Sequence, residues 1–148
     1  MKAKPHLLLV DDDRASMRYY VLVLEEAGYS VTQRRSVSDG IEYVKAYSPT
    51  IDGVILDLML PLGCEAYSKE SEFGLHGGLI VFRYLQAEHP GIPILVLSNT
   101  RSGEVLSAFT KSDSVQVEAK MNLIPSEIVS VMQRLVGSTR GSDGEAHP

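Results

Sequence analysis

Short apolar runs alternate with helical patterns along most of this chain. Five segments have the length of strands, and three of them are continuous apolar runs, which suit strands covered on both faces. The five segments are HLLLV (6–10), SVTQRR (30–35), DGVIL (52–56), IPILVL (92–97) and SVQVEA (114–119). Strands that alternate with helices predict an α/β fold, in which a parallel sheet lies between two layers of helices.

The helical patterns between these runs carry start and stop signals. Gly28 stands where a first helix would end. Ser36 and Asp39 have the spacing of a capping box, which begins a second helix. Pro125 can occupy the first turn of the last helix. Five helical patterns follow the five strand-like segments, and the one near residues 102–111 is the weakest.

Two stretches interrupt the alternation. A polar insertion at about 62–78 is much longer than the 2–6 residues that usually join a strand to a helix. The insertion is either a surface excursion or a partner-docking or lid segment. The Gly/Ser-rich stretch 137–148 is typical of a disordered tail or linker. We therefore expect one domain over residues 1–136, followed by that tail.

Composition limits the class of protein. A chain of 148 residues that is 44% hydrophobic can bury a core of its own. Its net charge of -5 argues against direct nucleic-acid binding, which depends on cationic contacts to phosphate. The single cysteine, Cys64, excludes an internal disulfide and fits a reducing compartment. No segment approaches membrane-spanning length, so we expect a cytoplasmic protein with no membrane contact.

Polar side chains follow four of the five expected strands. In an open α/β sheet, ligands bind outside the carboxyl ends of the strands. The residues at those ends are Asp11 and Asp12, Asp57, Ser98 and Lys120. If the strand order is the flavodoxin-like 2-1-3-4-5, the strands that end at Val10 and Leu56 are neighbours about 4.8 Å apart. Three carboxylates, a hydroxyl and an ammonium would then meet at one edge.

Each of these residues also has an ordinary interpretation. Taken alone, the run Asp11–Asp13 is more often a helix N-cap with first-turn acids. Their meeting at one edge favours a site instead. Two carboxylates about 4 Å apart repel by roughly 4 kcal/mol at an effective dielectric constant of 20, and a cation would remove that cost. Carboxylates with room for water suit Mg²⁺. A carboxylate beside Mg²⁺ can form an aspartyl phosphate, whose oxygens Lys120 and Ser98 would stabilise.

The sequence resembles the receiver domain of response regulators in two-component signalling. The resemblance runs from about Leu7 to Leu135 and rests on LLLVDDD, EEAGYSV, DGVILDLMLP, ILVLSN and Lys120, in that order. It implies a flavodoxin-like (βα)5 doubly wound sheet. It also implies that Asp57 accepts phosphate from the phosphohistidine of a sensor histidine kinase or phosphotransfer protein and thereby regulates a downstream partner.

The resemblance further assigns roles to individual residues. Mg²⁺ would be held by the carboxylates of Asp11, Asp12 and Asp57 and by the main-chain carbonyl of Met59. Ser98 would be the switch hydroxyl, and Lys120 would pair with the phosphate. Such a module catalyses at most its own phosphorylation and dephosphorylation, so it is not an enzyme in the usual sense.

The sequence departs from the family's pattern at several positions. Met121 stands where the family usually has proline after the lysine, and Val117 stands where it often has an aromatic residue. Both departures bear on how phosphorylation is transmitted. Asn99 is larger than the small residue common at its position and, with Met59, flanks the path of water to the phosphoryl group. We therefore expect a long-lived phosphoryl group.

Two other functions are compatible with parts of the pattern. A pseudo-receiver would keep the fold as a protein-interaction scaffold without phosphorylation, and Val117 and Met121 favour it. A phosphatase of the haloacid dehalogenase type also uses an aspartate after an apolar strand. That chemistry needs a second acid two residues later, where this chain has Met59. No output domain follows residue 136, so the sequence is either a stand-alone receiver or part of a longer chain.

Overall fold

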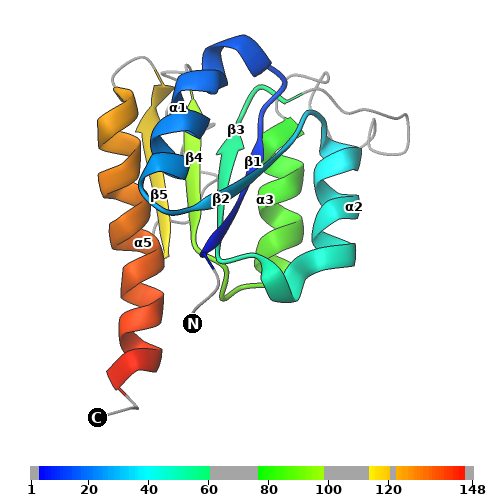
Figure 1. Cartoon of the computed structure of the whole chain (residues 1–148). Helices are drawn as coiled ribbons and strands as arrows, with labels where there is room; N and C mark the ends of the chain where they lie inside the picture. Colours follow the sequence, from blue (N-terminus) through cyan, green and yellow to red (C-terminus); the bar gives the residue numbers. More distant parts are fainter. Residues whose placement is uncertain (1–3, 61–76, 99–113, 121–122, 146–148) are drawn as a thin grey trace.

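The protein is described by a computed structural model that covers residues 4–60, 77–98, 114–120 and 123–145. Its centre is a five-stranded sheet in which every neighbouring pair of strands is parallel (Figure 1). The strand order is β2-β1-β3-β4-β5, which confirms the predicted flavodoxin-like sheet. The strands are β1 (His6–Val10), β2 (Ser30–Arg34), β3 (Gly53–Asp57), β4 (Ile94–Ser98) and β5 (Val115–Ala119).

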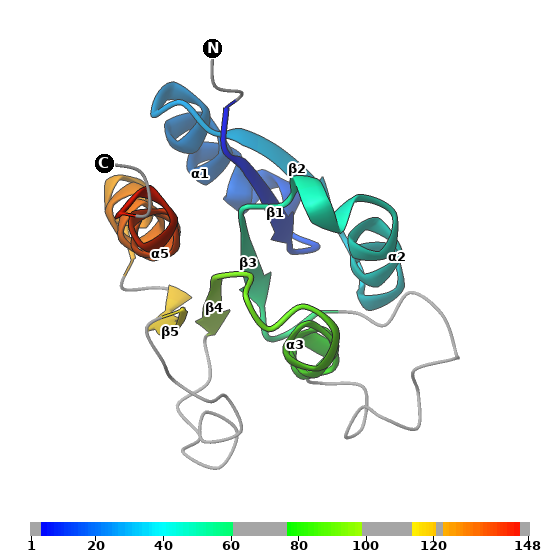
Figure 2. The same cartoon turned by 90° about the horizontal axis from the view of Figure 1, so that it is seen from below.

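Helices cover both faces of the sheet. They are α1 (Arg14–Glu26), α2 (Val37–Tyr47), α3 (Gly77–Glu88) and α5 (Pro125–Glu145), with a short 3₁₀ helix η1 (Ser48–Thr50) after α2. Helices α1 and α5 lie on one face, and α2 and α3 lie on the other (Figure 2). The helix predicted near 102–111 falls outside the described residues. None of the helices in the described ranges is long and apolar enough to cross a membrane.

Alternate side chains of the central strands enter two separate cores. In β1, Leu8 and Val10 pack with the residues of α2 and α3, whereas Leu7 and Leu9 pack with those of α1 and α5. All five residues of β3 and of β4 are buried, but β2 at the edge is only half-buried throughout. The continuous apolar runs in the sequence therefore mark the strands that are covered on both faces.

The predicted helix ends are confirmed at both α1 and α2. Gly28 follows α1 with a φ of +103°, a left-handed conformation that glycine adopts without a steric penalty. Ser36 is the N-cap of α2, and its Oγ accepts a hydrogen bond from the main-chain N–H of Asp39 at 3.2 Å. These two turns fix the ends of β2, the strand that runs beside β1.

The start of α3 corrects the predicted bounds of the insertion. Gly77 and Gly78 are the first residues of α3 rather than the end of a polar loop. A Cβ on Gly77 would lie 2.1 Å from the carbonyl oxygen of Leu60, and one on Gly78 would lie 2.3 Å from that of Asp57. The glycines are needed because the helix begins directly against the main chain after β3. The rest of the insertion, residues 61–76, is outside the described range.

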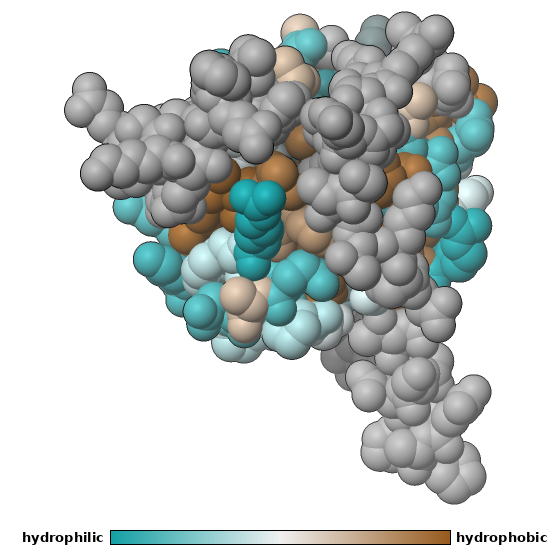
Figure 3. Space-filling view, turned by 180° about the vertical axis from the view of Figure 1, so that it is seen from behind, coloured by the Kyte–Doolittle hydropathy of each residue, from teal (hydrophilic) through white to brown (hydrophobic). Residues whose placement is uncertain are grey.

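The end of α5 corrects the prediction for the tail. The helix continues to Glu145, so residues 137–145 are helical rather than disordered. Once a helix is nucleated, each further residue adds a hydrogen bond, and Gly137, Gly141 and Gly144 weaken this propagation without preventing it. Figure 1 shows the end of α5 projecting past the sheet. Seen from behind the view of Figure 1, the molecule shows apolar surface beside hydrophilic side chains (Figure 3).

Candidate functional site

Three aspartates meet where β1 and β3 end. Val10 pairs with Leu56 in the ladder, so Asp11 and Asp57 stand side by side, one residue further along each strand. Asp11 is fully buried, Asp57 is 5% exposed, and Asp12 is exposed. Oxygen atoms of the three carboxylates all lie within 4.8 Å of one another. The predicted acidic cluster is therefore brought together at the carboxyl edge of the sheet.

Every polar group of Asp11 that can form a hydrogen bond does so. Its Oδ2 accepts a hydrogen bond from Lys120 Nζ at 2.9 Å, and its Oδ1 accepts one from the main-chain N–H of Asp13 at 2.8 Å. Its own N–H donates to the carbonyl oxygen of Arg34, and its carbonyl oxygen accepts from Gln33 Nε2, both at 2.9 Å. Each polar atom of Asp11 thus has a hydrogen-bond partner, as a buried charge requires.

The Asp57 carboxylate makes longer polar contacts than the Asp11 carboxylate does. Its Oδ1 accepts a hydrogen bond from the main-chain N–H of Met59 at 3.2 Å, and its Oδ2 lies 3.8 Å from Lys120 Nζ. Burial and the negative charge of Asp11 raise the Asp57 pKa to about 6, against the opposing effects of Lys120 and the Met59 hydrogen bond. In the absence of a cation, the Asp57 carboxylate is therefore electrostatically destabilised.

Lys120 reaches the aspartates from the end of β5. Burial would lower its pKa, but the hydrogen bond to Asp11 and the charges of Asp11 and Asp57 outweigh that effect, so its pKa is raised. The lysine consequently stays protonated and supplies the nearest positive charge among the described residues of the site. It lies nearer to Asp11 than to Asp57, a preference that the order of residues in the sequence does not indicate.

The other predicted site residues differ in how far the structure describes them. Ser98 is buried at the end of β4 and follows Leu97, which pairs with Asp57. Met59 is 45% exposed beside Asp57. Asn99 and Met121 lie outside the described residues, so their roles stay predictions. Val117 packs against the core beneath α2 and α3.

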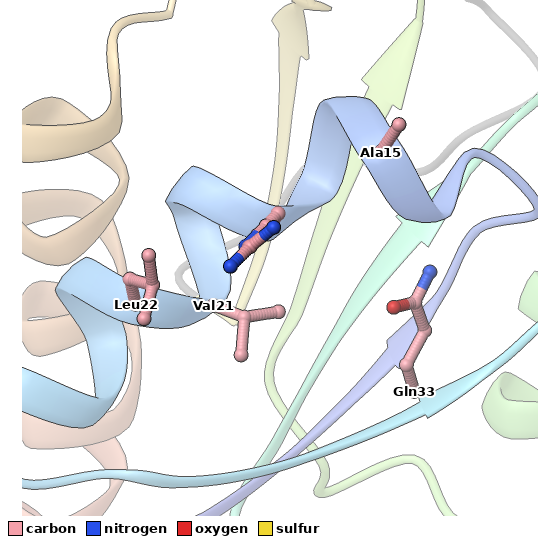
Figure 4. A pocket seen from close by; sticks show the side chains of 5 residues that line it. Ala15, Val21, Leu22 and Gln33 are labelled. Carbon is pink, nitrogen blue, oxygen red and sulfur yellow. The ribbon is translucent and has the colours of Figure 1, made fainter.

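Sequence reasoning missed Gln33. This residue stands in the edge strand β2 beside Thr32 and Arg34, and one polar side chain among others gives no signal of a role. Its side chain lines a hollow of about 480 Å³ between α1 and β2, together with Ala15, Arg18, Val21 and Leu22 (Figure 4). The amide group points away from β2 toward the end of β1 (Figure 4).

This parallel fold, with an acidic cluster and a lysine at one edge, defines a receiver-type signalling module, and comparison with known proteins agrees. Residues 7–122 match the family model of the response regulator receiver domain. The chain belongs to that family, as the sequence resemblance predicted.

Several relatives and solved structures are similar to this chain. The transcriptional regulatory protein GlrR of Escherichia coli K12 is 32% identical over 99 residues, which are 66% of this chain and 19% of that protein. This chain therefore matches only about a fifth of the length of that relative.

A receiver domain protein described as CheY-like, from Methanospirillum hungatei, superposes with a TM-score of 0.71 at 17% identity, over 94% of this chain and 98% of that one. A putative response regulator from Chloroflexus aurantiacus gives 0.68 at 26% identity, over 90% and 99%.

Proposed function

We propose that this chain is a phosphoaccepting receiver module in which Asp57 takes a phosphoryl group from a phosphohistidine. The observation that carries the proposal is the position of Asp57 at the carboxyl end of a central strand. There it lies within 4.8 Å of two further carboxylates and within 4 Å of a lysine ammonium. Carboxylate nucleophiles of this kind form acyl phosphates when nearby cations neutralise the charge of the phosphoryl oxygens.

The contacts favour Asp57 over Asp11 as the nucleophile. Both carboxylate oxygens of Asp11 are occupied at 2.8–2.9 Å, and its side chain is fully buried. Among the described residues, the polar contact of Asp57 Oδ2 is the longer one to Lys120, at 3.8 Å. The lone pairs of that oxygen are therefore the more available for attack on phosphorus.

The donor set fits Mg²⁺. The candidate ligands are the carboxylates of Asp11, Asp12 and Asp57, together with the main-chain carbonyl of Met59. All are hard oxygen donors, and the exposure of Asp12 leaves one side of the cluster open to the waters that Mg²⁺ retains. When bound, the ion would supply positive charge to the carboxylates and to the phosphoryl oxygens.

The protein's own residues account for the remainder of the reaction. An Asp57 oxygen forms a bond to phosphorus while the P–N bond of the phosphohistidine breaks, and its electron pair stays on the imidazole nitrogen, which takes up a proton. Lys120 pairs with a phosphoryl oxygen, since its ammonium already lies between Asp11 and Asp57. The Ser98 hydroxyl hydrogen-bonds another oxygen and acts as the switch.

The partners follow from this role. The phosphoryl donor would be a sensor histidine kinase or a phosphotransfer protein in the cytoplasm, and the phosphorylated module would regulate a downstream effector. The excess of acidic residues disfavours direct binding of this domain to nucleic acid. The module would turn over no substrate other than its own phosphoryl group.

A pseudo-receiver scaffold is the second candidate. Val117 favours it, because this half-buried side chain packs with the core beneath α2 and α3 and is too small for the large rearrangement of an aromatic switch. The aspartate and lysine cluster disfavours it, because a scaffold has no need of three mutually repelling carboxylates. Phosphorylation itself separates the two functions.

The test is phosphorylation by acetyl phosphate in the presence of Mg²⁺. Mass spectrometry should detect one added phosphoryl group on the wild type and on Asp39→Asn, which removes an exposed carboxylate on α2. Asp57→Asn should gain none. Equal labelling of Asp57→Asn would remove Asp57 from this role, and no labelling of a folded wild type would favour the pseudo-receiver.

A further inference from the structure

Asp11 continues the β1–β2 ladder at a point where the ladder cannot be completed. The last residues in register are Val10 and Arg34, and the N–H of Asp11 still donates to the Arg34 carbonyl oxygen at 2.9 Å. In a parallel ladder, the carbonyl oxygen of Asp11 would next accept a hydrogen bond from the main-chain N–H of the residue two positions beyond Arg34. That residue is Ser36, which instead forms the N-cap of α2.

Gln33 replaces the missing ladder bond with its side chain. Its Nε2 donates to the Asp11 carbonyl oxygen at 2.9 Å, a normal length for such a hydrogen bond. Figure 4 shows the amide of Gln33 directed away from its own strand, toward the end of β1. The edge strand therefore contacts both main-chain polar groups of Asp11, one through Arg34 and one through Gln33.

The Asp11 carbonyl belongs to the peptide group that joins Asp11 to Asp12. Because a peptide group is planar and rigid, fixing the direction of its carbonyl fixes the plane of the whole link. That link sets how the buried carboxylate of Asp11 and the exposed carboxylate of Asp12 are oriented relative to each other. Mg²⁺ requires near-octahedral geometry and therefore tolerates little change in that relation.

We propose that Gln33 is a positioning residue for the cation site, which holds the Asp11–Asp12 peptide in the orientation that binds Mg²⁺. The proposal deepens the proposed function and rests on it. Hydrogen bonds behind the ligands of a metal site typically change metal affinity by 10–100-fold when they are removed. We expect the lower end of that range, because Lys120 and Asp13 still hold the Asp11 carboxylate.

Loss of this hydrogen bond should affect metal binding more than stability. Gln33 borders the hollow beneath α1 and a second hollow of about 510 Å³ beside Arg34, Arg35 and Asp39. Water can therefore reach the Asp11 carbonyl when the amide is absent, so that carbonyl need not be left unpaired. A water molecule satisfies the carbonyl but does not fix its direction as an amide on a packed strand does.

The test compares Gln33→Met with Gln116→Met by calorimetric titration of Mg²⁺ into metal-free protein. Both changes replace an amide by an apolar side chain of similar length on an edge strand. Gln116 forms hydrogen bonds with Glu118 and Arg134, and it is not among the described hydrogen-bond partners of Asp11. Gln33→Met should bind Mg²⁺ about tenfold more weakly than the wild type, and Gln116→Met should bind within twofold of it. Melting temperatures without Mg²⁺ should be similar for both variants.

A third variant, Gln33→Glu, separates positioning from charge. It has the length of the native side chain but no donor, and it adds a negative charge near the site. Positioning predicts weaker Mg²⁺ binding than the wild type, whereas an effect of charge alone predicts tighter binding. Gln33→Glu also tests the role of Gln33 if Gln33→Met does not fold.

Each outcome either supports or overturns the proposal. Unchanged affinity in Gln33→Met, an equal loss in Gln116→Met, or tighter binding by Gln33→Glu would overturn the role of Gln33 while the proposed function stands. A wild type that binds no Mg²⁺ would instead overturn the proposed function, and the role of Gln33 with it.

Discussion

Replacing Asp57 by asparagine should stabilise the metal-free protein at neutral pH. Asp57 is 5% exposed, and burial together with the charge of Asp11 raises its pKa from 3.8 to about 6. A rise of about two in the pKa corresponds to roughly 3 kcal/mol, which is the free-energy cost of keeping this carboxylate ionised in the folded state. Asparagine keeps an oxygen that can accept the Met59 hydrogen bond, but it carries no charge.

The pH dependence has a definite sign. Between pH 4 and 6, the folded state keeps the Asp57 proton that the unfolded state has lost. The free energy of unfolding of the wild type therefore falls as the pH rises through this window. Below pH 4, both states are protonated and the cost disappears. The stability advantage of Asp57→Asn should thus be near zero at about pH 3 and should approach 3 kcal/mol by pH 7.

Urea unfolding followed by circular dichroism, with EDTA present, measures this difference at each pH. Asp39→Asn is the matched control, because it removes an exposed carboxylate and should gain no stability at pH 7. A pH-independent difference between Asp57→Asn and the wild type would refute the electrostatic reasoning. So would a variant that is less stable than the wild type at pH 7.

Three further expectations concern the same edge of the sheet. Gly78→Ala should lower the free energy of unfolding by about 1–3 kcal/mol, because its Cβ would meet main-chain atoms at the end of β3. Gly91→Ala is the control, because the space around Gly91 is open. Equal losses of stability in urea unfolding would contradict the close approach at Gly78. Millimolar Mg²⁺ should raise the wild-type melting temperature. Asp12→Ala should melt higher than the wild type without Mg²⁺ and respond to it less, and a flat wild-type response would contradict cation binding. Lys120→Met should destabilise the protein by roughly 3 kcal/mol, because it leaves the buried Asp11 charge unpaired. Wild-type stability of this variant in urea would contradict the contribution of the ion pair.

The fold and the acidic cluster could be predicted because both depend on pattern. The continuous apolar runs of β1, β3 and β4 indicate strands covered on both faces, and strand ends in a parallel sheet share one edge. The positions of Asp11 and Asp57 follow from these two rules. No tertiary detail is needed to bring their side chains together.

The features that sequence reasoning missed depend on atomic contacts. Gln33 acquires its role because the ladder ends one bond early, which no residue pattern indicates. The glycines at the start of α3 look like loop residues, and only the closeness of the chain after β3 explains them. Gly137 and its neighbours have the composition of a tail, yet α5 continues through them by main-chain hydrogen bonding.

The contact between Leu60 and Gly77 bears on how this domain tolerates changes in length. Residues 61–76 join two positions whose main chains already touch, since a Cβ on Gly77 would lie 2.1 Å from the Leu60 carbonyl oxygen. When the two ends of a connection are fixed, each doubling of its length costs only about 0.6 kcal/mol of closure entropy. We therefore expect that a peptide epitope grafted between Leu60 and Gly77 would leave α3 packed against the strand that carries Asp57.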